Sequence, residues 1–163
     1  MSPADLRSKL ETLHAGSYAW AIACCGGCRE EAADVLQAAY EKVLSGKAKF
    51  GGRSALKTWL FGVIRRTAQE AVRREYQRTV VYKNFADQPT DGNDTSVDVE
   101  QIGLALKQLS PQQLQVVHLV FYEGMTIQEA ADALEISVGS ARQHYARAKE
   151  KLRSQLQSEL AAS

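Results

Sequence analysis

The sequence predicts an all-α protein in which two small helical domains are joined by an acidic flexible linker, with a helix-turn-helix in the C-terminal domain. Three observations lead to this fold class. Apolar residues recur every three or four positions along most of the 163-residue chain, which is the period of amphipathic helices. The chain has only three prolines and 7% aromatic residues, which disfavours an all-β sandwich. Residues 79–99 interrupt the helical period with an acidic, turn-rich segment.

The first domain is expected to cover residues 1–78. Apolar positions predict a first helix over residues 3–24, and a break at Gly16 is left open. A Gly-Gly pair then predicts the end of this helix. A second helix with apolar positions at helical intervals follows, and Ser45-Gly46 is expected to end it.

A long basic helix is expected to complete the first domain. Ser54 is the expected N-cap of a helix over residues 55–78. Residues 46–78 hold nine Lys or Arg against two Asp or Glu, so this stretch either binds a polyanion or is an ordinary solvated face. Trp59 lies on the apolar stripe of the helix and is expected in the core.

The linker is expected over residues 79–99. It contains Pro89 and the turn pair Asp91-Gly92, and residues 79–100 carry one Lys or Arg against five Asp or Glu. A segment of this composition is ordered only where it contacts something else.

The second domain is expected over residues 100–163. Ser110 and Pro111 have the pattern of an N-cap followed by the first helical residue. Thr126, followed three residues later by Glu129, has the pattern of a capping box. The short helix that starts there, a tight turn and a last helix from about residue 138 to 156 match the length and pattern of a helix-turn-helix.

This helix-turn-helix favours DNA binding over an ordinary helical hairpin with a polar outer face. Ala130 is expected where the two helices approach closely, with Ile136 and Ala141 in the core between them. The last helix then presents polar side chains that suit base edges in a major groove, since Arg reads guanine and Gln reads adenine. These side chains are Arg142, Gln143, His144 and Arg147.

Several function classes are excluded by what the sequence lacks. It has no run of about 18 apolar residues, so no membrane insertion is expected. It also shows no nucleophile–base arrangement or phosphate-binding loop, so we expect no enzyme and no cofactor. Three cysteines fit a reducing cytoplasm better than a disulfide framework. Cys25-x-x-Cys28, with His14, could form a zinc or redox site, but the pattern favours buried structural cysteines, and no metal is expected.

Two segments of the chain resemble conserved regions of bacterial sigma factors. The fourth region, which binds promoters, is similar to SPQQLQVVHLVFYEGMTIQEAADALEISVGSARQHYARAKEKL. The second region is similar to EEAADVLQAAYEKVLSG together with FGGRSALKTWLFGVIRRTAQEAVRR. Their order, the acidic linker and the lack of a third domain between them resemble the extracytoplasmic-function (ECF) class of sigma factors.

The resemblance implies a transcription initiation factor that binds core RNA polymerase, through its β′ clamp and β flap, and promoter DNA. It implies that the linker threads toward the active centre of the polymerase. The expected contacts to the −35 element are Ser140, Arg142, Gln143, His144, Tyr145 and Arg147. The expected contacts to the −10 element are Lys57, Arg65, Arg66, Gln69, Arg73 and Arg74. The expected contacts to the polymerase are Glu31, Asp34, Gln37, Tyr40 and Glu41.

The chain departs from the family pattern on the expected polymerase-binding helix. Two carboxylates of the acidic family pattern are replaced by Ala33 and Ala38. Either the remaining acidic residues suffice for binding, or phosphorylation by a Ser/Thr kinase supplies the missing charge. Ser45 and Thr58 are the expected phosphorylation sites, because they flank the helices of this region. A further departure is Arg66, where the family usually has Asn.

Two other functions were considered. A stand-alone helix-turn-helix regulator would bind an operator without polymerase, but it leaves the basic helix and the acidic linker without a role. An adaptor that binds only proteins, with the cysteines as a redox element, would not need the last helix for activity. An anti-sigma factor is a further expected partner.

Overall fold

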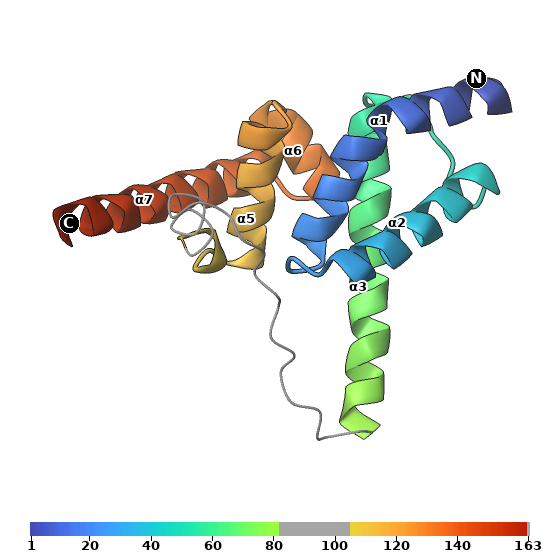
Figure 1. The fold of residues 1–163 in the computed structure, drawn as a ribbon. Coiled ribbons are helices and arrows are strands. Elements are labelled where there is room, and N and C mark those ends of the chain that lie inside the picture. The colour runs from blue at the N-terminus through green and yellow to red at the C-terminus, as the bar shows by residue number, and fades with distance from the viewer. Residues whose placement is uncertain (82–104, 163) are drawn as a thin grey trace. The chain divides into compact units, whose positions relative to one another are not determined.

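The computed structural model describes the backbone of residues 1–81 and 105–162 and the side chains of residues 1–74 and 105–157. All regular structure in this part of the chain is helical, which confirms the all-α prediction. The chain divides into two compact units (Figure 1). One consists of residues 1–88 together with residues 132–135, and the other consists of residues 89–131 and 136–163. Each unit is described by itself.

The N-terminal unit consists of three helices, α1 (Pro3–Cys24), α2 (Arg29–Leu44) and α3 (Leu56–Val81). Each helix contacts the other two. Trp20 of α1 lies at the centre with 0% of its surface exposed. Its ring stacks on Phe61 of α3 at 5.7 Å, and its Nε1 donates a hydrogen bond of 2.9 Å to the carbonyl of Phe61. A single side chain from α1 therefore fixes both the spacing and the register of α3.

Helix α1 is continuous, so the break at Gly16 that the sequence left open does not occur. Burial of Ser17, Trp20 and Ala21 directly after this glycine stabilises the helix through it. The helix begins at Ser2, which forms a capping box with Asp5.

Helix α3 differs from the prediction at both ends. It begins at Leu56, and the Ser54 hydroxyl donates to the carbonyl of Ala55 instead of accepting from the first turn, so Ser54 is not the N-cap. The helix continues to Val81, which makes the first three residues of the expected linker helical. Residues 82–99 of that linker lie outside the described residues.

The C-terminal unit contains α5 (Pro111–Val117), a π-helical turn η1 (His118–Tyr122), the first part of α6 (Ile127–Leu134) and α7 (Val138–Ala162). The last three residues of α6 are grouped with the N-terminal unit. The predicted capping signals are confirmed. Ser110 forms a capping box with Gln113, and Thr126 forms the expected hydrogen bonds with Glu129. The return of the apolar period also predicts a helix from about Val99 to Leu109. Residues 105–109 of this segment are described, and residues 105–107 are helical.

The single helix expected after Pro111 changes to a wider π-helical turn at His118. The amide of Glu123 donates to the carbonyl of His118, five residues earlier, at 3.0 Å. Two aromatic side chains of this turn, Phe121 and Tyr122, are 82% and 69% exposed. The period of the apolar residues does not reveal the π-helical turn, because one extra residue in a turn only shifts the apolar face of the helix by one position.

Two of the three residues expected in the core of the helix-turn-helix are buried, whereas the third, Ile136, is half-buried. Ala130 of α6 and Ala141 of α7 are fully buried, which permits close approach of the two helices. Helix α6 ends in a Schellman motif, in which the amide of Ile136 donates to the carbonyl of Ala131 at 3.1 Å. Glu135 occupies the left-handed position of this motif with φ of 56°, where glycine is the usual residue.

Candidate nucleic-acid and protein interfaces

Helix α7 presents the expected base-reading residues to solvent. Its N-cap is Ser137, whose Oγ accepts a hydrogen bond of 3.1 Å from the amide of Ser140. Arg142, Gln143 and Arg147 are exposed, while Ala141 and Ala148 on the opposite side are buried. The N-terminal half of the helix therefore carries two cations and an amide that are available to a ligand, as a recognition helix requires.

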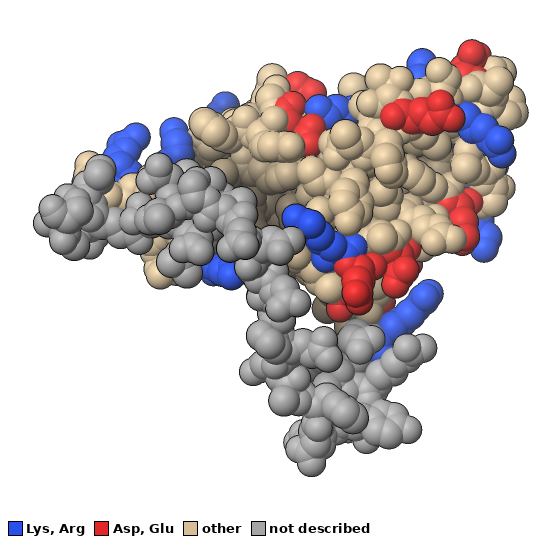
Figure 2. All heavy atoms as spheres, in the orientation of Figure 1, with Lys and Arg blue, Asp and Glu red and all other residues tan. Residues whose placement is uncertain are grey.

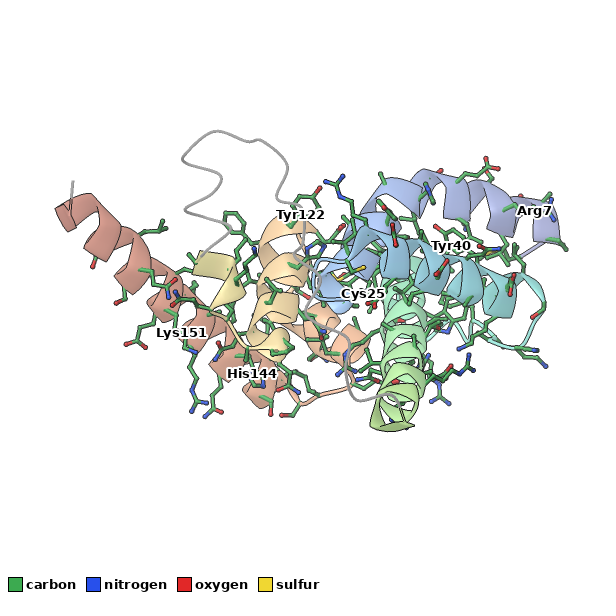
Figure 3. All side chains as sticks on the ribbon, turned by 60° about the horizontal axis from the view of Figure 1, so that its bottom comes forward. Arg7, Cys25, Tyr40, Tyr122, His144 and Lys151 are labelled. Atoms are coloured by element: carbon green, nitrogen blue, oxygen red, sulfur yellow. The ribbon has the colours of Figure 1, made fainter. Side chains whose placement is uncertain are left out.

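The other three expected −35 contacts lie differently. The Ser140 hydroxyl accepts a hydrogen bond from Ser137 at 3.0 Å, as part of the capping arrangement. His144 and Tyr145 are half-buried, and His144 Nδ1 is enclosed within the described structure. The ammonium of Lys149 lies over the Tyr145 ring at 4.5 Å. The side chains of these three residues are partly enclosed by the protein, whereas Arg142 and Gln143 are exposed to solvent. Figure 3 labels His144 on this helix.

Helix α3 separates an apolar and a basic face. Arg66, Gln69 and Arg73 are exposed and share one face at helical spacing, opposite the buried Ile64 and Ala68. The Arg66 guanidinium forms an exposed ion pair of 2.6 Å with the carboxylate of Glu135, so a nucleic-acid contact by Arg66 has to displace that carboxylate. The other expected −10 residues border this face. Arg74 is exposed, whereas Arg65 and Lys57 are half-buried, and the Lys57 ammonium lies 5.7 Å from the centre of the Phe61 ring. Trp59, which the sequence placed in the core, is half-buried and packs against Phe50 at 5.3 Å.

An acidic residue within the basic helix was missed from the sequence. Glu70 accepts a hydrogen bond of 2.7 Å from the ammonium of Lys42 on α2. This bond, together with the nearby charges of Arg74 and Arg66, lowers the pKa of Glu70 below its usual value. Because the two partners are 28 residues apart, no local pattern reveals the pair. It ties the basic helix to α2.

Helix α2 carries the expected polymerase-binding residues on its outer face. Glu31, Asp34, Gln37 and Glu41 are exposed, whereas Tyr40 is half-buried and hydrogen-bonded to His14 at 3.1 Å. Burial raises the pKa of Tyr40. The acidic residues therefore form an acidic stripe along α2. Figure 2 shows acidic groups beside basic groups on the N-terminal unit.

A groove of about 1070 Å³ runs between α2 and α3. It is lined by three acidic residues of α2 and by Ala38, one of the two positions where the family carboxylate is missing. Val72 and Leu44 add exposed apolar surface to its walls. This is a surface on which a protein partner can bury apolar area beside charged contacts.

The two expected phosphorylation sites have different exposure. Ser45 is exposed at the end of α2 and lines the groove. Thr58 is only 3% exposed, and its Oγ1 is enclosed in the folded domain. A kinase needs an accessible hydroxyl, so the folded N-terminal domain presents Ser45 and not Thr58.

The described residues contain no group of three or more His, Cys, Asp or Glu side chains that would hold a metal ion. His14, which was weighed as a partner of the cysteines, contacts Tyr40 instead. Among the described residues, no helix is both long enough and apolar enough to span a membrane.

Comparison with protein families defines the class of protein to which these surfaces belong. Residues 14–78 match the family described as Sigma-70 region 2, and residues 105–154 match Sigma-70, region 4. The matched ranges contain the acidic stripe of α2, the basic face of α3 and the helix-turn-helix. They identify the class as RNA polymerase sigma factors with the second and fourth regions.

Two Bacillus subtilis (strain 168) proteins are similar over most of this chain. One is the ECF RNA polymerase sigma factor SigX, 32% identical over 120 residues, which cover 67% of this chain and 62% of the relative. The other is the RNA polymerase sigma factor YlaC, 30% identical over 132 residues, which cover 76% of both proteins. The chain belongs to the ECF family of RNA polymerase sigma factors.

Two solved structures share the fold. The sigma factor RpoE from Bartonella quintana, in complex with the anti-sigma factor NepR, has a TM-score of 0.75 at 24% identity, covering 94% of this chain and 97% of that chain. CnrH in complex with the cytosolic domain of CnrY has a TM-score of 0.61 at 21% identity, covering 93% and 87%.

Proposed function

We propose that this protein binds core RNA polymerase and directs it to promoters by recognising −10 and −35 elements. One observation carries the proposal. Within a single chain, a helix-turn-helix with outward-facing Arg142 and Gln143 follows a domain with an acidic stripe on one helix and a basic face on another. A DNA-binding protein that works alone has no need of the acidic stripe, whereas a factor that must hold both polymerase and DNA needs both signs of charge.

The roles divide between the two units. Arg142 and Gln143 suit base edges of the −35 duplex, and Arg147 suits a phosphate or a base. Arg66, Gln69 and Arg73 lie along one face of α3, where cations and an amide suit the backbone and bases of an unpaired −10 strand. The acidic stripe of α2 and its groove suit a basic surface of the polymerase clamp. Such a factor acts where the polymerase is, in the cytoplasm.

Run-off transcription with core polymerase tests the proposal. Purified protein should yield discrete transcripts from a subset of genomic promoter fragments and should bind those fragments weakly without polymerase. Tight and sequence-specific binding without polymerase, together with no transcript from any promoter, would instead indicate a stand-alone regulator.

Two substitutions separate the proposed roles. Arg142→Ala should reduce discrimination between −35 sequences by about 1–3 kcal/mol, the value of one bidentate base contact. Arg73→Ala should leave that discrimination intact. It should reduce the slope of the logarithm of the open-complex formation constant against the logarithm of salt concentration by about one, the value for one lost phosphate contact. Arg153→Ala, an exposed change near the far end of α7, serves as the control. Footprinting and permanganate reactivity measure both steps, and equal loss of binding with no separate melting defect contradicts the division.

Phosphorylation of Ser45 is the proposed means of replacing the missing acidic charge. A phosphate adds about 1.5–2 negative charges at neutral pH, and Ser45 lines the same groove as Ala38. Core polymerase should bind Ser45→Glu more tightly than Ser45→Ala, and kinase treatment should raise the affinity of the unmodified protein. If Ser45→Ala binds the polymerase as strongly as the phosphorylated protein does, phosphorylation of Ser45 does not regulate polymerase binding. A Ser/Thr kinase and an anti-sigma factor are the proposed regulatory partners.

A further inference from the structure

The corner between α1 and α2 holds two cysteines at the ends of one tight turn. The amide of Cys28 donates a hydrogen bond of 3.3 Å to the carbonyl of Cys25, which closes a four-residue turn. Gly26 and Gly27, the two central residues, have φ of 64° and 94°. The end Cα atoms of such a turn lie less than about 7 Å apart. Disulfides span Cα distances of about 4.4–6.8 Å, so the turn holds both thiols within bonding range without unfolding either helix.

The turn is open to small molecules. Both glycines are exposed, and no atom lies within 4 Å of the position that a Cβ would take on either of them. Cys25 and Cys28 are each half-buried. Figure 3 labels Cys25 at this corner. The sulfur atoms are therefore neither sealed in the core nor fixed by packing on every side.

The three cysteines of the corner are chemically distinct. Burial raises the pKa of Cys25 to about 11, and burial raises the pKa of Cys24 further, with a contribution from the neighbouring Cys25. Both are therefore thiols at neutral pH. Cys28 is the N-cap of α2, and its side chain forms no capping hydrogen bond.

We infer that Cys25 and Cys28 form a reversible dithiol–disulfide pair that is oxidised by low-molecular-weight disulfides. The Cys28 thiolate attacks one sulfur of the small disulfide and releases one equivalent of its thiol, which leaves a mixed disulfide on Cys28. The Cys25 thiol then loses its proton and attacks the Cys28 sulfur, which releases the second equivalent. Two cysteine thiols are oxidised to one disulfide, and one small disulfide is reduced to two thiols.

The pair is placed where its state affects the acidic stripe. Cys25 lines the groove between α2 and α3 together with Glu31 and Asp34. Cys28 directly precedes the first turn of α2, which contains Glu31. A bond between the two sulfurs removes the freedom of the glycine turn that leads into this helix. Oxidation therefore stiffens the start of α2 and changes one wall of the groove.

Equilibration in glutathione buffers of increasing oxidising strength tests the inference. The folded full-length protein should lose Cys25 and Cys28 thiols together and release two equivalents of reduced glutathione for each disulfide. The remaining thiols are trapped by alkylation, and the peptide of residues 10–29 is sequenced by mass spectrometry. Cys24→Ala should oxidise to the same extent as the wild type. Cys25→Ser and Cys28→Ser should accumulate no more than a mixed disulfide with glutathione.

Circular dichroism identifies any variant that fails to fold, and fragmentation of the wild-type peptide then assigns the bonded sulfurs without substitution. Hydrogen exchange of residues 29–34 should slow in the oxidised protein, a readout that requires no polymerase. The inference is overturned if both thiols persist in the most oxidising buffer, if only mixed disulfides form, or if Cys24 provides one of the bonded sulfurs.

Discussion

The two domains differ in how their sequences specify their helices. In the C-terminal domain, each of α5, α6 and α7 begins with a hydroxyl residue that accepts a hydrogen bond from an amide three residues later. In the N-terminal domain, α2 begins at Cys28 with no side-chain capping bond, and the central contact joins Trp20 to Phe61, 41 residues away. A local capping signal therefore marks the start of all three C-terminal helices. In the N-terminal domain such a signal marks only α1, where Ser2 and Asp5 form a capping box, and packing positions α2 and α3.

This difference predicts unequal responses to mutation. Removal of one N-cap should lower the free energy of unfolding by a modest amount, and the effect should be confined to the helix that loses its cap. Removal of the central packing residue should affect the whole N-terminal domain, because three helices share it.

The largest expected effect comes from Trp20→Ala. Truncation of a fully buried aromatic side chain costs about 3–5 kcal/mol, and it also leaves the carbonyl of Phe61 without its indole donor. Hydrogen exchange of the full chain should show loss of protection in α1 to α3 and unchanged protection in α5 and α7. Trp20→Phe, which keeps the ring stack but removes the indole donor, is the matched control and should cost less. Equal loss of protection in both domains would show that their stabilities are not separate.

Ser110→Ala tests the local side of the comparison. The substitution removes both bonds of the capping box with Gln113, and loss of an N-cap costs about 1 kcal/mol. Urea denaturation should show a lower midpoint for the C-terminal domain alone. Ser110→Asp keeps an N-cap acceptor and should retain most of the stability; a loss as large as that of the alanine variant would assign the effect to something other than capping.

Glu135→Gly should stabilise the helix-turn-helix. Glu135 has φ of 56°, a strained conformation for a residue with a side chain. Its carboxylate also forms an exposed ion pair of 2.6 Å with Arg66, which substitution by glycine or by alanine removes. Relief of the strain, less the greater flexibility of glycine in the unfolded chain and the small contribution of an exposed ion pair, gives a net gain of up to about 1 kcal/mol. Glu135→Ala loses the same ion pair but keeps the strain, so it should lower the thermal midpoint. If the alanine variant gains as much as glycine, strain is not the cause.

Glu70→Gln should have the smallest effect, on the long-range contact between α2 and α3. The hydrogen bond from Lys42 lowers the pKa of Glu70 below 4.5, so the pair stabilises the fold above that pH and loses its contribution as pH falls through the lower, folded value. Both side chains are partly exposed, so we expect a loss of about 0.5 kcal/mol near pH 7. Urea midpoints measured from pH 7 to pH 3 should converge for the two proteins. A difference that grows toward acid pH would contradict this sign.

The sequence predicted the fold class and family, and it predicted the C-terminal helix starts to within one residue, because caps at Ser110 and Thr126 are local signals. Predictions from the sequence were wrong where tertiary contacts determine the local structure. Ser54 resembles an N-cap but bonds elsewhere, and Gly16 does not break a helix whose next turn is buried. The π-helical turn at His118 leaves no trace in the apolar period.

The candidate sites follow the same division. The residue types on α3 and α7 were predictable from charge and spacing, and Arg66 and Arg142 are exposed, while their roles in DNA binding stay predictions. Which face each residue occupies was not predictable one by one, since His144 is half-buried and Thr58 is enclosed. The Lys42–Glu70 pair joins positions that only the folded domain brings together. The contacts to DNA and polymerase stay predictions.

The position of Trp20 also gives the molecule a selective optical signal. Both tryptophans of the chain, Trp20 and Trp59, lie in the N-terminal domain. The Trp20 indole is fully buried and stacked on Phe61, whereas Trp59 is half-buried. Tryptophan emission therefore shifts to the red when the N-terminal domain opens and is insensitive to unfolding of the helix-turn-helix. Fluorescence and far-ultraviolet circular dichroism, recorded on one sample, distinguish the melting of the two domains without a label or a truncation.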